Sequence, residues 1–429
     1  MKKKTNVLIF PAGEINSVEL HEALSHNVNI EVYGASSVDR HGPYVFEHYR
    51  TGLPFISAPN FLPAFNALLN EWSIDFIFPT HDTVTLYLAE HREELAAALI
   101  APPVETAAVC RDKKKTYDLF ADCAFCPAVY PSPEQFPCFI KPRDGQGSQG
   151  AKLLKGAEDI PAGFASADFV ITEYLPGEEL TVDCLTDAQG ALKAAMPRVR
   201  SRTMAGVSVA GKTLPADEEI TEIAETINSR LRFCGLWYFQ VKRAQNGRWK
   251  LLEISGRCAG TMCLSRARGV NLPLLSVYAA MGRQVSVFEN PDPVTVDRTL
   301  ISRYSAGFEY HTAYVDYDDT VVEGDRVCLP VIRYLYQCRN RGVKTVLLSR
   351  HELDHEDSLL HSLSAHAISE ALFDQIVSVP EGHEKSEYIK PEGAVFIDNA
   401  YAERKKIHDC YGMPVFDVEG IEVLTDWRC

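Results

Sequence analysis

Residues 236–257 read LWYFQVKRAQNGRWKLLEISGR, and this stretch decides how the middle of the chain folds. Two runs of aromatic and branched side chains flank Asn246-Gly247, a pair typical of a two-residue hairpin turn, so the stretch predicts two antiparallel strands. Gln240 and Glu253 lie on the two arms of this hairpin. Oxygen atoms on adjacent strands suit Mg²⁺, which takes one or two protein oxygens together with phosphate oxygens and water. The alternative is that both side chains are structural.

Upstream of this hairpin, residues 138–154 read CFIKPRDGQGSQGAKLL, an apolar strand followed by a glycine-rich loop. The backbone N–H groups of such a loop can surround phosphate oxygens, and Lys141 at the end of the strand supplies positive charge. Gly145, Gly147 and Ser148 are the loop residues that we expect at a phosphate. The tip of a flexible hairpin has a similar composition and is the alternative.

Between these two stretches, residues 170–183 read VITEYLPGEELTVD. Glu173 and Leu175 lie at the end of a predicted strand, and Glu179 follows shortly after it. A backbone edge with a carboxylate beside it can bind an adenine and a ribose, so we interpret these residues as candidate nucleotide contacts. Acidic residues on a solvated turn are the alternative.

The hydrophobic pattern divides the chain into three predicted domains, 1–107, 108–295 and 296–429. In the first, short apolar runs alternate with amphipathic stretches, the last of which covers residues 83–99; this is typical of βαβ units with a parallel sheet. The second combines strand-like runs with glycine-rich turns, which predicts an α+β fold with antiparallel sheets. The third alternates strands and helices again and is expected to be doubly wound. The predicted fold class is therefore α/β and α+β, in several domains.

Polar side chains follow several predicted strands of the third domain. Asp316 and Asp318 come directly after the apolar run AYV, and Ser349 and Asp398 end two later runs. Ligands of parallel sheets sit outside the carboxyl ends of the strands, so these groups can meet in one crevice. One aspartate there can act as a nucleophile and the other as an acid or base, while the first also binds Mg²⁺. Polar strand ends by coincidence are the alternative.

The motifs of residues 1–290, taken in order, resemble those of the ATP-grasp superfamily, particularly its carbamoyl-phosphate-synthetase-like and carboxylate–amine ligase branches. The resemblance implies a parallel α/β domain that precedes an α+β ATP-grasp domain, with ATP and Mg²⁺ as cofactors. It assigns the ATP to Lys113, Lys141, Gly145, Gly147, Ser148, Glu173, Leu175 and Glu179. It assigns the metal to Gln240 and Glu253, and it makes Arg257, at the end of the same motif, a catalytic candidate.

One position departs from the metal motif of this family. Ser255 stands where most members carry a metal-binding asparagine. A serine hydroxyl is shorter than an amide and is a weaker ligand of Mg²⁺ than an amide carbonyl. We therefore expect a second metal position that is looser or that is completed by water.

Residues 206–213, GVSVAGKT, satisfy the pattern of a phosphate-binding P-loop, yet the flanking sequence argues against one. The preceding run is basic and polar, and Pro215 disfavours the helix that would have to follow. We expect a mobile loop near the acceptor substrate instead. Arg198, Arg200 and Arg202 stand at alternate positions before it and can point one way on a strand, toward a phosphate or a substrate carboxylate, with Arg200 as the catalytic candidate. Three arginines on a solvated edge strand are the alternative.

The ordered set Asp-x-Asp-x-Thr, Ser, Lys and Asp within residues 311–429 resembles the haloacid dehalogenase-like phosphatases. The resemblance implies a Rossmann-like domain in which Asp316 is the nucleophile and Asp318 the general acid and base. It assigns the phosphate to Ser349 and Lys385, and Mg²⁺ to Asp316, Asp318 and Asp398.

Three further features of this domain bear on its activity. Lys390 competes with Lys385 for the phosphate, and Lys385 is preferred because it would open a short helix. Asn399 replaces an aspartate that is common after the metal-binding aspartate, which lowers the charge at the metal. Only 28 residues lie between Thr320 and Ser349, so we expect no large lid and an open site for a bulky substrate. A domain that keeps the fold without activity is the alternative.

Composition disfavours several functional classes. The 429-residue chain carries a net charge of −15, which disfavours nucleic acid and anionic membranes as partners. No apolar run reaches the roughly 18 residues of a membrane span, so none is expected. Twelve scattered cysteines indicate free thiols and a cytoplasmic protein.

We therefore predict a bifunctional enzyme. Its ligase would activate a small-molecule carboxylate as an acyl phosphate for attack by an amine or a similar nucleophile, and its phosphatase would act on a phosphorylated metabolite. An oligomer is compatible with the sequence. Two alternatives stay open: a carbamoyl-phosphate-synthetase-like kinase that phosphorylates a small carboxylate without ligation, and a nucleotide-sensing protein with degenerate sites.

Overall fold

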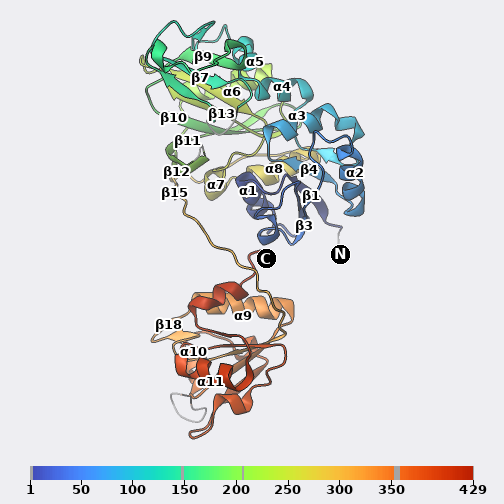
Figure 1. Cartoon of the computed structure of the whole chain (residues 1–429), viewed down its shortest axis with the longest axis vertical. Helices are drawn as coiled ribbons and strands as arrows, with labels where there is room; N and C mark the ends of the chain where they lie inside the picture. Colours follow the sequence, from blue (N-terminus) through green and yellow to red (C-terminus); the bar gives the residue numbers. More distant parts are fainter. Residues whose placement is uncertain (1–2, 146–148, 205–206, 352–357, 429) are drawn as a thin grey trace. The chain divides into compact units, whose positions relative to one another are not determined.

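The structure is a computed structural model that describes residues 3–145, 149–204, 207–351 and 358–428. The chain forms two compact units, Met1–Leu300 and Ile301–Cys429, coloured from blue to yellow and from orange to red in Figure 1. Residue 296, where the sequence predicts the third domain to begin, lies inside strand β15 (Thr295–Asp297) of the first unit. The division of the first unit at residue 107 stays a prediction.

The first unit begins with a parallel sheet, as the alternating pattern of its sequence predicts. Its elements are β1 (Thr5–Phe10), α1 (Ile15–Leu24), β2 (Ile30–Ala35), β3 (His48–Arg50), α2 (Phe61–Glu71), β4 (Phe76–Pro79), α3 (Asp82–Glu90), β5 (Ala98–Leu99), α4 (Val104–Arg111) and α5 (Lys113–Leu119). The strand order is β3-β2-β1-β4-β5, and every neighbouring pair is parallel. Successive side chains of β1 enter different cores: Ile9 packs with Leu20 of α1, and Phe10 packs with Phe65 of α2.

The amphipathic stretch 83–99 is not one helix, which corrects the sequence prediction. Helix α3 ends at Glu90, and the chain turns back to add β5 to the sheet beside β4. Arg92 fixes this turn, because its guanidinium donates to the carbonyls of Leu99 and Ala101 at 2.9 and 2.6 Å. The early end of α3 thus coincides with hydrogen bonds from Arg92 to a later segment. The hydrophobic pattern of residues 83–99 does not reveal this end.

Two antiparallel sheets form the rest of the first unit. Their strands are β6 (Val129–Tyr130), β7 (Cys138–Pro142), β8 (Lys152–Leu154), β9 (Phe169–Glu173), β10 (Glu179–Thr186), β11 (Leu192–Met204), β12 (Val207–Thr213), β13 (Gly235–Arg243), β14 (Trp249–Ser255) and β15. The larger sheet runs β14-β13-β10-β11-β12-β15, and the smaller one β6-β9-β7-β8. Strands β13 and β14 form the predicted hairpin, with Gly247 at a positive φ of 81° in the turn. Helices α7 (Cys263–Ala267) and α8 (Leu272–Ala280) follow the hairpin.

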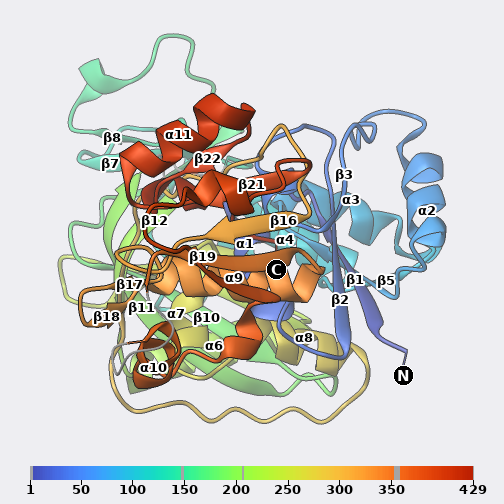
Figure 2. The same cartoon turned by 90° about the horizontal axis from the view of Figure 1, so that it is seen from below.

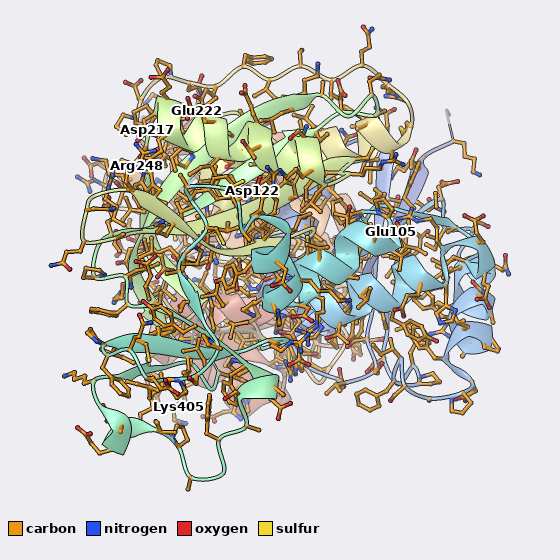
Figure 3. The ribbon with its side chains drawn as sticks, turned by 90° about the horizontal axis from the view of Figure 1, so that it is seen from above. Glu105, Asp122, Asp217, Glu222, Arg248 and Lys405 are labelled. Carbon is orange, nitrogen blue, oxygen red and sulfur yellow. The ribbon has the colours of Figure 1, made fainter. Side chains whose placement is uncertain are left out.

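Helix α6 (Glu218–Arg230) covers the larger antiparallel sheet. Asp217 caps its start, because the carboxylate accepts a hydrogen bond from the backbone N–H of Ile220 at 2.8 Å. Ile220 and further apolar residues at helical spacing pack against Trp237 of β13. The opposite side of the helix carries exposed charges such as Glu222, and Figure 3 shows Asp217, Glu222 and Arg248 close to this helix.

Residues 207–213 form strand β12, so the predicted absence of a P-loop is confirmed and the expected mobile loop is wrong for these residues. Strand β12 pairs antiparallel with β11 on one side and β15 on the other. A Cβ atom at Gly211 would lie 2.5 Å from the carbonyl oxygen of Val199, so glycine there allows the strands to approach closely. Gly206 lies outside the described residues.

The second unit is built on a five-stranded sheet in the order β20-β19-β16-β21-β22, with all neighbours parallel. Its elements are β16 (Thr312–Val315), α9 (Leu329–Arg341), β19 (Lys344–Ser349), α10 (Leu359–Ala365), β20 (Gln375–Ser378), β21 (Ala394–Ile397), α11 (Tyr401–Tyr411) and β22 (Val415–Phe416). Val315 of β16 shares a core with Leu335 of α9, whereas Tyr314 shares the opposite core with Ile407 of α11. Helices therefore cover both faces, as expected of a doubly wound sheet (Figure 2).

Segment 321–348 of the second unit contains no inserted lid. All its residues are described, and they form the short hairpin of β17 (Val322–Glu323) and β18 (Arg326–Val327), helix α9 and most of strand β19. A hairpin, a helix and a strand thus take up nearly all of this segment and leave no room for a large lid, as its length predicts.

The longest helices of the described residues, α6 and α9, have 13 residues each. A helix needs about 20 apolar residues to cross a bilayer. Within the described ranges, no helix has the length and the apolar character for such a crossing.

The buried ion pair between Asp183 and Arg198 predicts a large loss of stability when one partner is removed. Arg198 donates to Asp183 through Nε and Nη2 at 2.8 and 3.0 Å, and both side chains are almost fully buried. Asp183→Ala should lower the free energy of unfolding by about 3–5 kcal/mol, because Arg198 keeps only the neutral hydroxyl of Thr261 and its buried charge loses its counter-ion. Asp297→Ala, which removes the exposed partner of Arg202, should lower it by less than about 1 kcal/mol. Urea denaturation measures both, and equal losses would contradict this interpretation.

Candidate active sites

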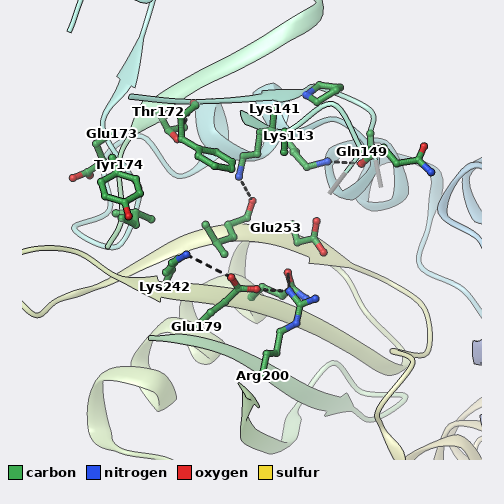
Figure 4. A pocket seen from close by; sticks show the side chains of 17 residues that line it. Lys113, Lys141, Gln149, Thr172, Glu173, Tyr174, Glu179, Arg200, Lys242 and Glu253 are labelled. Atoms are coloured by element: carbon green, nitrogen blue, oxygen red, sulfur yellow. Dashed lines mark hydrogen bonds and ion pairs between the residues drawn. The ribbon is translucent and has the colours of Figure 1, made fainter. Parts of the chain in front are cut away.

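A pocket lies between the two antiparallel sheets of the first unit (Figure 4). The smaller sheet lines it from β7 and β9, and the larger sheet lines it from β10, β11, β13 and β14. The pocket brings together nine residues predicted from the sequence, namely Lys113, Lys141, Gly145, Glu173, Leu175, Glu179, Arg200, Gln240 and Glu253. The predicted Arg257 is not among the lining residues, and Gly147 and Ser148 lie outside the described residues.

Lys141 is buried in this pocket and joins the two sheets. Its Nζ donates to the carbonyl oxygen of Leu252 on β14 at 2.9 Å and lies 5.1 Å from the centre of the Tyr117 ring. Burial and, second, the positive charge of Lys113 lower the pKa of Lys141 to about 7. A bound anion favours the charged form of a lysine. The position is therefore suited to a phosphate chain.

Lys113 reaches the same pocket from the first turn of α5. Its Nζ donates to the carbonyl oxygen of Gly145, at the start of the glycine-rich loop, at 2.6 Å. Asp112 caps α5 by accepting from the N–H of Lys114 at 2.9 Å and also accepts from Arg143 at 3.2 Å. Helix α5 and the segment that follows β7 are thus fixed together, and Lys113 of α5 and Lys141 of β7 both line the pocket.

Gln240 and Glu253 are direct cross-strand partners in the pairing of β13 with β14. Directly opposed residues have Cβ atoms about 5 Å apart, so their oxygen atoms can share one ion. The amide nitrogen of Gln240 donates to Thr181 at 3.3 Å, and its amide oxygen accepts from Arg200 at 3.5 Å. Within the described residues, no group of three or more His, Cys, Asp or Glu side chains could hold a metal. The pair fits Mg²⁺, because this ion commonly takes its other ligands from phosphate and water.

Two glutamates of the pocket have different partners. Glu179 of β10 accepts a hydrogen bond from Arg200 of β11, and it lies 3.9 Å from the Nζ of Lys242 on β13. The carboxylate of Glu173 instead accepts from the backbone N–H of Ala128 at 2.9 Å. Figure 4 shows Glu179 directed toward Arg200 and Lys242, with Glu173 on the far side of the pocket. A nucleotide contact at position 173 would therefore come from its backbone.

The sequence did not point to Asp82, which the fold brings to the end of strand β14. Ser255 donates to Oδ1 of Asp82 at 2.6 Å, and Arg257 donates to Oδ2 at 2.8 Å. Burial alone would raise the pKa of Asp82, but the charge and hydrogen bond of Arg257 and the hydroxyl of Ser255 lower it below its ordinary value. Arg257 is therefore engaged by a carboxylate at the start of helix α3. The available signal was an acidic residue shortly after the apolar strand FIFP.

The three alternate arginines of β11 do not face one common anion, which corrects the sequence prediction. Arg198 is buried against Asp183, Arg200 lines the pocket, and Arg202 pairs with Asp297 at 2.6 Å on the surface. The pairing of β11 with β12 is irregular between Arg200 and Arg202. A bulge at this point changes the alternation of side chains along the strand.

The carboxyl ends of β16 and β21 carry a second candidate site. Lys385, at the start of the short helix η6 (Lys385–Tyr388), lies 2.7 Å from Asp316 and 2.6 Å from Asp398, and all three are buried. Asp398 also accepts from the backbone N–H of Ala400 at 2.7 Å. Burial raises the pKa of Asp316, the ammonium of Lys385 opposes this rise, and the charge of Asp398 adds to it. Three predicted residues thus meet in one buried cluster.

Asp318 follows the same strand and has two partners near β19. Ser349 donates to Asp318 at 3.3 Å, and Nδ1 of His351 lies 3.1 Å from Oδ1 of Asp318. The sequence pattern did not identify His351 as a site residue. Its place two residues after the end of β19 was the available signal. Carboxylate oxygens such as those of Asp316 and Asp398, on neighbouring strand ends, are the ligands that Mg²⁺ prefers. The donor set of this site therefore fits the ion.

Two positions that the sequence left open have clear surroundings. Lys390 is exposed, and its backbone N–H donates to the hydroxyl of Tyr314 at 2.9 Å, whereas Lys385 is buried between the two aspartates. The backbone N–H of Asn399 donates to Thr320 at 3.0 Å, and its amide oxygen accepts from the same hydroxyl at 3.4 Å. The burial of Lys385 between the two aspartates, against the exposure of Lys390, favours Lys385 as the phosphate lysine.

Part of the first unit, which includes several strands of the pocket but not β7, matches a known family model. Residues 165–304 match the family model described as ATP-grasp in the biosynthetic pathway with Ter operon. The matched residues include strands β10 to β14. The comparison with curated proteins gives no match.

Solved structures show the same fold at low sequence identity. N5-carboxyaminoimidazole synthetase from Staphylococcus aureus complexed with ADP is similar at a TM-score of 0.59 and 14% identity, over 70% of this chain and 83% of that one. Biotin carboxylase from Campylobacter jejuni, in a complex named β-γ-ATP, is similar at 0.54 and 16%, over 66% and 72%. L-amino acid ligase from Bacillus licheniformis is similar at 0.53 and 16%, over 65% and 75%. These similarities show that the first unit shares the fold of these structures, and residues 165–304 match an ATP-grasp family model; the resemblance of residues 311–429 stays a prediction.

The low pKa of Lys141 predicts that nucleotide binding takes up a proton. Near pH 8 most of the free protein carries a neutral Lys141, since its pKa is about 7. A phosphate chain raises that pKa, so binding should take up most of a proton, and the affinity should fall as the pH rises from about 7 to about 9. Calorimetry in buffers of different ionisation enthalpy measures the uptake.

The matched variant for this prediction is Lys141→Arg. Arginine keeps the charge and cannot lose its proton in this pH range, so ATP should bind to the variant without proton uptake. An uptake equal to that of the unaltered protein would show that another group titrates.

Proposed function

We propose that this chain, whose fold is of the ATP-grasp type, is an ATP-dependent ligase that activates a small-molecule carboxylate as an acyl phosphate for attack by an amine or a similar nucleophile. The observation that carries the proposal is the pocket between two antiparallel sheets. It is lined by three lysines, Lys113, Lys141 and Lys242, and by an oxygen pair in direct cross-strand register. The similar structures support nucleotide use and ligase activity, since one of them is complexed with ADP and another is an L-amino acid ligase.

In the proposed reaction, a carboxylate oxygen of the substrate attacks the terminal phosphorus of ATP, and the bond between that phosphorus and the ADP oxygen breaks. The amine then attacks the acyl carbon, and phosphate leaves. Positive groups that face the phosphate oxygens lower the barrier of such a transfer. Lys113, Lys141 and Arg200 would provide them from α5, β7 and β11. Mg²⁺, held by Gln240 and Glu253, would neutralise charge on the phosphate chain when bound.

Removal of the Glu253 carboxylate tests the metal assignment. Glu253→Gln keeps the size of the side chain but weakens its hold on Mg²⁺, so the gain in ATP affinity on adding Mg²⁺ should shrink on the order of 10-fold or more. The affinity for ATP in EDTA should not fall. Glu225→Gln, at an exposed position of α6, is the matched control and should keep the full gain. Calorimetry with and without Mg²⁺ gives the result, and an unchanged gain in Glu253→Gln would contradict the assignment.

Release of ADP separates the ligase from its alternatives. A ligase that follows the proposed reaction releases ADP fully only when an acid and an amine are both present. A small-carboxylate kinase releases ADP with the acid alone. A nucleotide sensor binds Mg-ATP and releases no ADP with any pair in the panel. Measuring ADP over a matrix of acids and amines therefore decides between the three.

We propose a second activity for residues 301–429, a Mg²⁺-dependent hydrolysis of phosphomonoesters of the haloacid dehalogenase type, with a phosphorylated metabolite as substrate. The observation that supports it is the cluster of Asp316, Lys385 and Asp398 at the carboxyl ends of parallel strands. Asp316 would attack phosphorus while Asp318 protonates the leaving oxygen. Asp318 would then take a proton from the water that releases phosphate from Asp316.

The phosphate-binding side of this proposal rests on further residues of the same unit. Lys385 would offset the charge of the transferring group, and Ser349 would hydrogen-bond to its oxygens. Asp316 and Asp398 would hold Mg²⁺, which would reduce the repulsion between carboxylate and phosphate when bound. The absence of an inserted lid in segment 321–348 leaves room for a bulky ester.

Replacement of the nucleophile tests the phosphatase. Asp316→Asn should abolish the hydrolysis of p-nitrophenyl phosphate by the full chain in Mg²⁺, because it removes the carboxylate that would attack phosphorus and form the phosphoenzyme. Asp319→Asn is the matched control: Asp319 is exposed at a positive φ of 53°, a conformation that asparagine tolerates, so the rate should stay within about twofold. Activity that survives Asp316→Asn, or a folded unaltered chain inactive on every phosphate tried, would sink the proposal.

A further inference from the structure

We propose that His351 is a positioning residue for Asp318, which holds the acid and base of the phosphatase reaction in one orientation; this inference rests on the phosphatase proposed above. Asp318 is the most exposed member of the candidate site, with 55% of its side chain accessible. An exposed carboxylate next to a strand end can adopt several rotamers, and restricting a side chain to one of them has an entropic cost. A group that transfers a proton to a leaving oxygen must nevertheless lie within hydrogen-bond reach of it.

The contacts of Asp318 come from the segment that follows β19. Nδ1 of His351 lies 3.1 Å from Oδ1 and 3.4 Å from Oδ2 of Asp318. The hydroxyl of Ser349 donates to Oδ2 at 3.3 Å. Two side chains from one neighbouring strand end therefore contact both oxygens of the carboxylate. Because Ser349 is also a candidate phosphate ligand, His351 is the partner that Asp318 would keep when Ser349 turns to a phosphate.

His351 is itself held by three contacts. Its backbone N–H donates to the hydroxyl of Ser349 at 3.1 Å, and its carbonyl oxygen accepts from Ser378 of β20 at 2.7 Å. Its ring stands edge-on to the buried Tyr317, with the ring centres 5.7 Å apart. The hydroxyl of Tyr317 is in turn 2.7 Å from that of Ser362 on α10. His351 is therefore fixed to three parts of the unit and can fix Asp318.

If His351 positions Asp318, the loss of kcat/KM on replacing His351 should depend on the leaving group of the ester. An alkoxide leaves poorly without a proton, whereas p-nitrophenolate leaves without one. The value of kcat/KM reports only the steps up to formation of the phosphoenzyme, in which Asp318 acts as the acid. A displaced Asp318 should therefore lower kcat/KM for an alkyl phosphate far more than for p-nitrophenyl phosphate. A merely structural defect would lower both to the same extent.

The experiment compares His351→Phe and His351→Asn in the full chain with Mg²⁺, using glycerol 2-phosphate and p-nitrophenyl phosphate. Phenylalanine keeps a ring beside Tyr317 but has no N–H. We expect kcat/KM for glycerol 2-phosphate to fall on the order of 10- to 100-fold, and that for p-nitrophenyl phosphate by less than about threefold. Asparagine places an amide near the position of Nδ1 and should recover most of the loss. His361→Phe, at an exposed position of α10, is the control and should not change either value.

Each outcome decides a separate point. Equal losses on both esters, or no recovery in His351→Asn, overturn the positioning role while the phosphatase stands. An unaltered chain that is folded but inactive on both esters overturns the phosphatase and this inference with it. If His351→Phe does not fold, as judged by its thermal melting curve, His351→Ala is measured in its place, with the same expected ratio of losses.

Discussion

The first unit depends on one buried cation, the ammonium of Lys141, which stands on the smaller sheet and donates to a carbonyl of the larger one. Its hydrogen-bond partner, the carbonyl of Leu252, is neutral, and the charges of Glu253 and Glu179 offset only part of the cost of desolvation, so the pKa falls to about 7. A bound anion would therefore favour the charged form of this lysine. Glu253 follows Leu252 on β14 and is paired with Gln240 on β13, so the proposed oxygen pair for Mg²⁺ lines the same pocket as the lysine.

Three buried charged groups of this protein differ in how fully their neighbours compensate their charge. Arg198 and Asp183 form a closed pair with two hydrogen bonds, which leaves no net charge and serves the fold. Lys385 lies between two buried aspartates, so that cluster carries an excess negative charge and suits a cation. Lys141 has a carbonyl partner and suits an anion. The two candidate sites therefore differ from the structural pair in the same respect: in each, neighbouring groups compensate the buried charge only in part, and a ligand can neutralise the rest.

The sequence predicted what local patterns determine. The hairpin turn joins its two strands directly, so the sequence alone places Gln240 and Glu253 on adjacent strands, and strand ends located the cluster around Asp316. Features that depend on distant contacts were missed: Asp82 reaches Ser255 across 173 positions, and His351 meets Asp318 across 33. Irregularities were also missed, since a register shift separates Arg200 from Arg202 on β11 and the contacts of Arg92 accompany the early end of α3. The periodic spacing of apolar residues encodes neither the register shift in β11 nor the end of α3.

Hydrogen exchange of the full chain can show whether a nucleotide binds between the two antiparallel sheets. The exchange of backbone amides is measured with and without Mg²⁺ and a non-hydrolysable ATP analogue at saturation. We expect slower exchange on both sides of the pocket, in residues 139–145 and 172–179 and in residues 249–255. Unchanged exchange in these three segments, or protection confined to other parts of the first unit, would contradict binding between the two sheets.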